Sequence, residues 1–207
     1  MALRWPSGPP RIYAVPDSRE GWVESHVLLL RSYCEGSNPI EYDYSGIREE
    51  GAELKGIGGY CAGAEPLRQL HERTREICDR YLRGEYGPPR LKADLANVVG
   101  CCVVKGNVRR SAEILVGSMS DLEFLDLKNY DKHPERAAWG WMSNNSAALE
   151  TPEDFARPPE IAARIRSNGE PGFINRIAMR KFGRFGREVA DRATLFNPCG
   201  EVPLENK

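Results

Sequence analysis

The side chains best suited to chemistry fall in one short stretch near the end of the sequence, Asn197-Pro198-Cys199-Gly200-Glu201. In an extended chain alternate residues share a face, so Asn197, Cys199 and Glu201 would point the same way. A thiol acts as a nucleophile or carries a radical, a carboxylate moves protons, and an amide orients a hydroxyl group. Pro198 and Gly200 are typical of a loop tip rather than of a central strand. On its own, Cys199 is also consistent with a buried structural cysteine.

A second candidate site is a basic segment expected between a helix and a strand. Three cations flank a glycine in Lys105-Gly106-Asn107-Val108-Arg109-Arg110-Ser111. Backbone amides and guanidinium groups in such a loop can hold a phosphate. A solvated basic turn is the alternative interpretation.

Composition limits the classes of partner. The 207 residues carry 29 Lys and Arg against 30 Asp and Glu, a formal net charge of -1. This balance argues against bulk electrostatic binding of nucleic acid, although Lys105, Arg109 and Arg110 leave a local contact open. No apolar run is long enough to cross a bilayer, and the first residues contain no apolar signal core. We therefore expect a cytoplasmic protein with no membrane partner.

The cysteine and histidine positions indicate neither a metal site nor a disulfide framework. Six cysteines stand at positions 34, 61, 78, 101, 102 and 199, with no Cys-x-x-Cys pair. We expect most of them to be buried thiols in a reducing compartment, with Cys199 as the exception. His26 and His71 are isolated in sequence and are expected at the surface or boundary of helices.

The spacing of apolar residues, helix N-caps and helix-breaking Gly and Pro residues predict the elements that position these residues. Extended runs are predicted over residues 11–15, 40–44, 111–117 and 193–204. Helices are predicted over 20–33, from 66 to a stop at Gly84, over 91–104, 120–128 and 158–167, and from 175 to about 182. Strands that alternate with helices favour an α/β class with parallel pairing.

Several segments together resemble the adenosylcobalamin-dependent ribonucleoside-triphosphate reductases, which are class II ribonucleotide reductases. The segments are residues 15–22, 47–51, 55–59, 106–113, 124–129, 139–146, 168–172 and 197–201. They occur in the order of that family. The resemblance implies part of a ten-stranded α/β barrel whose catalytic cysteine lies on an internal finger loop. Residues 1–10 would be a loose lead-in, and residues 11–207 would be a partial catalytic barrel.

The resemblance also implies a reaction, the reduction of ribonucleoside triphosphates to deoxyribonucleoside triphosphates for DNA synthesis. Cys199 would become a thiyl radical through adenosylcobalamin and remove the 3′-hydrogen of the ribose. Glu201 would take the 3′-hydroxyl proton, and Asn197 would bind the sugar. The cobalamin-binding region would lie mostly outside this chain, and a thioredoxin-like protein would supply electrons.

An allosteric effector region is implied as well, with a deoxynucleotide as effector. The basic segment resembles the specificity loop, in particular at Lys105, Gly106, Asn107, Arg109 and Arg110. Asp17 and Ser18 match contacts to the effector ribose, and Arg48, Lys55 and Gly56 match contacts to its phosphates.

The resemblance has gaps. The family needs two further cysteines as a reducing pair, and none of the other five cysteines stands at a matching position. We therefore expect a fragment that does not turn over alone. The alternatives are the large chain of a ribonucleoside-diphosphate reductase and a non-catalytic nucleotide-binding module.

Overall fold

The computed structural model describes residues 2–54, 58–105, 111–182, 186–188 and 190–205. The chain forms two compact units. The first comprises Met1–Leu91 and Val98–Ser111, and the second comprises Lys92–Asn97 and Ala112–Lys207. Helix α3 (Pro88–Val104) contributes residues to both units.

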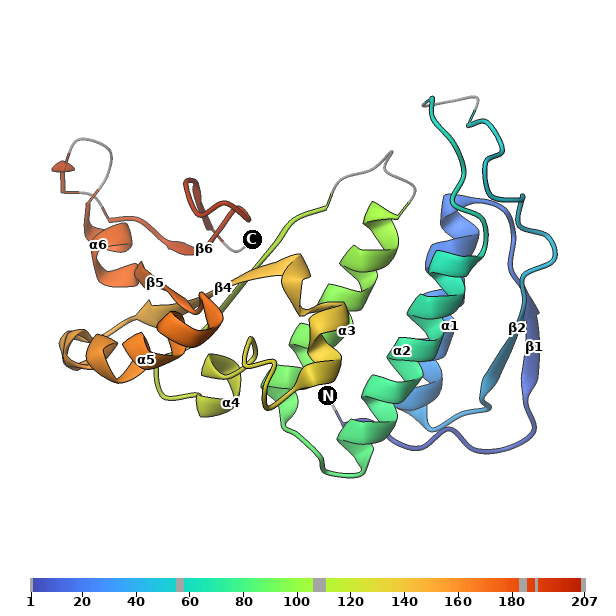
Figure 1. Cartoon of the computed structure of the whole chain (residues 1–207), viewed down its shortest axis with the longest axis horizontal. Coiled ribbons are helices and arrows are strands. Elements are labelled where there is room, and N and C mark those ends of the chain that lie inside the picture. Colours follow the sequence, from blue (N-terminus) through green and yellow to red (C-terminus); the bar gives the residue numbers. More distant parts are fainter. Residues whose placement is uncertain (1, 55–57, 106–110, 183–185, 189, 206–207) are drawn as a thin grey trace. The chain divides into compact units, whose positions relative to one another are not determined.

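The first unit begins with a parallel strand–helix–strand arrangement. Strand β1 (Arg11–Ala14) pairs with β2 (Ile40–Asp43), and α1 (Arg19–Glu35) connects them. Parallel strands need such a crossover. Helix α2 (Glu65–Leu82) packs beside α1 (Figure 1).

Local sequence explains where α1 begins and ends. The Ser18 hydroxyl accepts a hydrogen bond from the Gly21 amide at 3.0 Å, which satisfies one of the unpaired donors at the start of the helix. The helix ends at Gly36, which adopts the left-handed conformation that glycine tolerates best. The lead-in is tied to this end, because the Arg4 amide donates to the Tyr33 carbonyl at 2.7 Å.

The interior of the first unit forms between α1 and α2. Leu29 and Tyr33 of α1 and Leu67, Leu70 and Ile77 of α2 are all buried. Burial of each such side chain stabilises the fold by about 1.5–3 kcal/mol before entropy is counted. The two helices therefore hold the first strand pair and the loops around it.

The second unit contains a three-stranded parallel sheet in the order β3 (Glu113–Ser118), β4 (Ser143–Leu149), β5 (Gly172–Asn175). Its other elements are short. They are α4 (Leu122–Leu125), η1 (Pro134–Ala138), η2 (Gly140–Met142), η3 (Pro152–Ala156), α5 (Pro158–Asn168), α6 (Arg176–Lys181) and the antiparallel pair β6 (Ala193–Phe196) and β7 (Pro203–Glu205).

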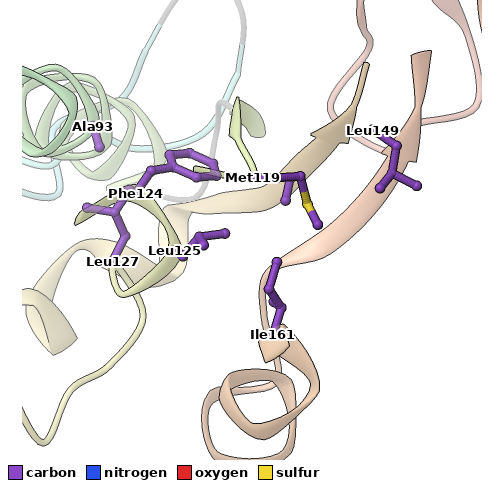
Figure 2. Packing of buried hydrophobic residues seen from close by; sticks show 8 residues of the cluster. Ala93, Met119, Phe124, Leu125, Leu127, Leu149 and Ile161 are labelled. Carbon is purple, nitrogen blue, oxygen red and sulfur yellow. The ribbon is translucent and has the colours of Figure 1, made fainter. Parts of the chain in front are cut away.

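One face of this sheet carries the core of the second unit. Figure 2 shows the cluster, in which side chains from α3, α4, the sheet and α5 meet. Its members are Ala93, Met119, Phe124, Leu125, Leu127, Ala147, Leu149 and Ile161. The core therefore fixes one side of β4 and leaves its opposite side for other contacts.

The α/β class with parallel pairing is confirmed, and so are the predicted helices and strands to within a few residues. Strand β5 was not among the predicted strands, and neither was β4. Its sequence Ser-Asn-Asn-Ser-Ala-Ala-Leu lacks the β-branched and aromatic residues that mark strands. The run predicted as extended over 193–204 is also different, because it turns back on itself as the β6–β7 hairpin.

Candidate functional site

The sequence Asn197-Pro198-Cys199-Gly200-Glu201 connects the two strands of the β6–β7 hairpin. The Gly200 amide donates to the Asn197 carbonyl at 2.8 Å, which closes a β-turn over Pro198 and Cys199. Gly200 has a φ of 83°, a conformation that disfavours other residues. The backbone amide of Asn197 donates to the Val202 carbonyl at 3.1 Å.

The Asn197 side chain helps to build this turn. Its Oδ1 accepts a hydrogen bond from the Val202 amide at 2.7 Å. This bond fixes the orientation of the carboxamide, and it therefore also fixes the direction in which the Nδ2 group of Asn197 points. An amide held in this way is suited to donating a hydrogen bond to a hydroxyl group.

The expectation that Asn197, Cys199 and Glu201 share one face of an extended chain is wrong. A turn interrupts the alternation, because Pro198 and Gly200 favour a turn over a strand. The expected loop tip is confirmed. Cys199 and Glu201 are both exposed at this tip, so the thiol and the carboxylate are accessible from outside the unit.

The other cysteines differ from Cys199. All six thiols are free, Cys78 and Cys101 are buried, and Cys34, Cys61 and Cys102 are partly buried. Burial raises the pKa of both Cys78 and Cys102 to about 12, which keeps these thiols protonated at neutral pH. Cys199 is therefore the most accessible thiol of the chain.

Three of the residues predicted to bind an effector lie together at the start of α1. Arg48 Nε donates to Asp17 Oδ2 at 2.6 Å, and this bond raises the pKa of the arginine. Ser18 follows Asp17 directly and caps the helix. The structure thus brings a carboxylate and a guanidinium group together on a partly exposed surface, and their contacts to ribose and phosphate stay predictions.

Lys105, at the end of α3, lines a shallow pocket of about 480 Å³ in the first unit. The other lining residues are Glu50, Gly51, Tyr60, Cys61, Ala62, Glu65, Pro66 and Gln69. The pocket adjoins Arg48, because Cys61 Sγ lies 4.0 Å from the Arg48 carbonyl oxygen. Tyr60, whose ring is exposed in this pocket, was not among the predicted site residues.

The remaining effector predictions fall outside the described residues. They concern Lys55, Gly56, Gly106, Asn107, Arg109 and Arg110. Within the ranges that the structure does describe, no three His, Cys, Asp or Glu side chains are placed to hold a metal ion. In the same ranges no helix is long and apolar enough to cross a membrane.

The expected surface or boundary position is wrong for His71. This side chain is fully buried, and its ring stacks on Tyr42 with 3.9 Å between centroids. Its Nε2 lies 3.0 Å from Ser25 Oγ, and its Nδ1 lies 2.8 Å from the Tyr44 hydroxyl. Burial lowers the pKa of His71 to about 3 and that of the neighbouring His26 to about 4. Helical spacing alone did not reveal that partners from β2 and α1 would enclose the ring.

Comparison with known proteins shows what this chain is similar to. Residues 7–77 match the family described as "B12-dependent ribonucleotide reductase, insertion domain". The chain is 44% identical over 200 residues to a probable adenosylcobalamin-dependent ribonucleoside-triphosphate reductase of Dictyostelium discoideum, and 42% identical to the reductase of that name from Euglena gracilis. Each match covers 94% of this chain and 26% of the relative.

A solved structure described as a B12-dependent (class II) ribonucleotide reductase has the same fold over 95% of this chain, with a TM-score of 0.77 and 32% identity. This segment is 28% of that protein. The chain is thus homologous to the B12-dependent class of ribonucleotide reductases. More particularly, it corresponds to a segment of the adenosylcobalamin-dependent ribonucleoside-triphosphate reductases and spans about a quarter of their length. The expected relationship to the α/β fold of ribonucleotide reductases is confirmed.

Proposed function

We propose that this chain provides the radical-bearing hairpin and part of the effector site of a reductase that converts ribonucleoside triphosphates to deoxyribonucleoside triphosphates. The observation that carries the proposal is the hairpin tip at residues 197–201, which presents an exposed thiol beside a carboxylate and an oriented carboxamide. The relatives named as such reductases match the chain along nearly its whole length. The proposed partners include no nucleic acid and no membrane.

The chemistry of the hairpin divides among three side chains. As a thiyl radical, the Cys199 sulfur takes the 3′-hydrogen atom of the ribose and becomes a thiol. Glu201 takes the proton of the 3′-hydroxyl, which helps the 2′-hydroxyl to leave as water once that group is protonated. Asn197 binds the sugar through its oriented carboxamide. The hydrogen atom then returns from Cys199 to C3′, and a dithiol with a thioredoxin-like reductant supplies the two electrons and the protons.

The residues present fit a cobalamin cofactor at one point, the Cys199 thiol. Its exposure at a hairpin tip leaves it accessible to a group bound by residues other than those of its own unit. When bound, adenosylcobalamin supplies the carbon-centred radical that converts the thiol to a thiyl radical. This chain contributes the sulfur and the turn that holds it.

The effector region is proposed to bind a deoxynucleotide in the first unit. Asp17 accepts hydrogen bonds from ribose hydroxyl groups, and Ser18 extends that surface. Arg48, which now donates to Asp17 at 2.6 Å, turns part of its guanidinium group toward phosphate oxygens. Lys105 adds a second cation from the pocket beside Arg48. Lys55, Gly56, Gly106, Asn107, Arg109 and Arg110 complete the proposed region.

A hybrid enzyme tests the reaction. This chain replaces the matching segment of the Dictyostelium discoideum relative, which is 44% identical to it. We expect the hybrid to form deoxyribonucleoside triphosphates only when adenosylcobalamin is supplied. Formation of deoxynucleotide without adenosylcobalamin, or a preference for ribonucleoside diphosphates, would instead support a diphosphate reductase and contradict the proposal.

A further inference from the structure

Four of the segments that carry the family resemblance meet at the amino end of β4. They are residues 124–129, 139–146, 168–172 and 197–201. These segments are far apart in sequence, and they come together in the second unit through hydrogen bonds and an ion pair of Lys128, Asn144 and Glu170. The reaction proposed above uses only the last of these segments, so the role of the other three needs a physical explanation.

A buried polar network fixes the backbone on both sides of Asn144. Lys128 Nζ donates to the Ser143 carbonyl at 2.7 Å and lies 3.3 Å from Glu170 Oε2. The same carboxylate oxygen accepts the Asn145 amide at 2.9 Å. The Ser143 hydroxyl donates to Asn145 Oδ1 at 2.8 Å. Because Ser143, Asn145 and Lys128 are buried, these bonds are shielded from water and hold the strand firmly.

Asn144 projects from the opposite face of the strand. Side chains alternate along β4, and the burial pattern follows that alternation, with Ser143 and Asn145 buried and Asn144 exposed. Asn144 Nδ2 donates to the Pro198 carbonyl oxygen at 2.9 Å. Pro198 directly precedes Cys199 in the turn. Through this bond, strand β4 holds the hairpin tip at Pro198, the residue before Cys199.

We propose that Asn144 is a positioning residue for Cys199, held in place by Lys128 and Glu170. The β6–β7 hairpin is joined by a short turn, so its own hydrogen bonds fix its shape but not its placement over the sheet. Arg180 Nε donates to the Ala193 carbonyl at 3.2 Å and ties the base of the hairpin to α6, whereas the bond from Asn144 places its tip. A reacting sulfur must be held within a fraction of an ångström, because small displacements of reacting groups reduce rates strongly. The inference rests on the proposed function of Cys199.

Hydrogen exchange of the 207-residue chain tests the anchoring. Asn144→Ala removes the donor, and Asn144→Asp keeps its shape but replaces the amide nitrogen with an oxygen. In both variants we expect exchange of the Gly200 and Val202 amides to become about fivefold faster, the order expected for one neutral hydrogen bond. Ser146→Ala is the matched control, because Ser146 lies two residues further along the same face of β4, and it should exchange like the parent chain.

Steady-state kinetics of the hybrid reductase test the positioning. We expect Asn144→Ala and Asn144→Asp to lower kcat by about tenfold or more and to leave KM for the nucleotide within about twofold. Ser146→Ala should retain the parental kcat. Because Asn144 is exposed and polar, the variants are expected to unfold at the parental temperature, which is measured alongside.

Three results would overturn the inference. They are unchanged amide exchange in both Asn144 variants, faster exchange with parental kcat, and an effect confined to KM. Failure of the proposed function gives a different result, since a hybrid with parental Asn144 would then form no deoxynucleotide. In that case the exchange experiment on the 207-residue chain still decides whether Asn144 anchors the hairpin.

Discussion

Burial separates the ionisable side chains of this chain into those that stabilise the fold and those available for chemistry. His71 and the thiols of Cys78 and Cys102 are enclosed, and their pKa values move toward the neutral form. Cys199 and Glu201 are exposed at a turn. The groups proposed to react are therefore those that solvent and substrate can reach.

The buried histidines predict a fold that loses stability in mild acid. His71 has a pKa of about 3 in the folded chain against 6.5 in the unfolded one, so below pH 6.5 the unfolded state binds more protons. Stability is complete above about pH 7 and falls as the pH drops toward the folded value. Between pH 7 and pH 5 we expect His71 alone to cost about 2 kcal/mol, measured by urea unfolding.

The variant His71→Gln separates this effect from general acid lability. It lowers stability at pH 7, because the stacking on Tyr42 is lost, but it should flatten the pH dependence by about 2 kcal/mol over the same interval. A slope equal to that of the parent chain would show that His71 is not the titrating group. His26 has a pKa of about 4 in the folded chain, so it also destabilises the fold as the pH falls. This contribution of His26 to the pH dependence remains in the His71→Gln variant.

A buried ion pair gives a second prediction at the residue scale. The side chains of Asp94 and Arg136 are 1% and 0% exposed, and Asp94 Oδ1 accepts Arg136 Nε at 2.6 Å and Trp139 Nε1 at 2.8 Å. Asp94→Asn leaves a buried guanidinium group without its counter-charge. We expect a loss of about 3 kcal/mol or more in urea unfolding.

The exposed pair of Arg192 and Glu205 in the same unit is the control. Its side chains are 83% and 43% exposed at a separation of 3.0 Å. Glu205→Gln is expected to change stability by less than about 1 kcal/mol. Equal losses of unfolding free energy in Asp94→Asn and Glu205→Gln would show that burial does not determine how much each ion pair contributes to stability.

At the scale of elements, close packing of α4 on β3 constrains the sheet. A β-carbon on Gly117 would lie 2.3 Å from the Phe124 ring, which belongs to the core cluster (Figure 2). Such an approach forces the ring or the strand to move. We expect Gly117→Ala to destabilise the chain by about 1–3 kcal/mol in thermal or urea unfolding.

Gly46→Ala provides the matched comparison. Its added β-carbon would meet only the Val15 carbonyl at 3.4 Å, which is ordinary contact, and Gly46 is exposed. Its effect should stay within about 0.5 kcal/mol. If both substitutions were equally mild, α4 would not pack on β3 as described.

Element types were predictable from sequence where a local signal existed. The N-cap at Ser18 and the glycine at position 36 marked α1, and apolar spacing marked α2. Strand β4 carries no such signal, because it is held by bonds from its backbone at Ser143 and Asn145 to the side chains of Lys128 and Glu170, which lie 15 and 25 residues away in sequence. Long-range partners of this kind cannot be recovered from local propensity.

The candidate site was predictable in its residue types but not in its geometry. Asn197, Cys199 and Glu201 stood out by chemistry, yet Asn197 closes a turn, so the three side chains do not follow strand alternation. Asn144 gave no catalytic signal, because its contact with Pro198 spans 54 residues. The family resemblance supplied the order of the segments, and the structure supplied the reason several of them meet.

At the scale of the whole molecule, the two units divide the proposed tasks. The first unit carries Asp17, Ser18, Arg48 and the pocket at Lys105, and the second carries the Cys199 hairpin and the strand that anchors it. The chain spans about a quarter of the length of the relatives it matches, so the complete reaction is tested in the hybrid reductase.

Substitution of Cys199 in the hybrid reductase shows whether this thiol is the reacting group. Cys199→Ser changes one exposed atom, so it should leave thermal stability unaltered while deoxynucleotide formation falls below detection, because a serine hydroxyl does not replace the thiol. Cys34→Ser, a partly buried thiol of α1, should keep the parental rate. Retention of activity on the order of a tenth or more of the parental rate in Cys199→Ser would contradict the assignment of Cys199 as the reacting thiol.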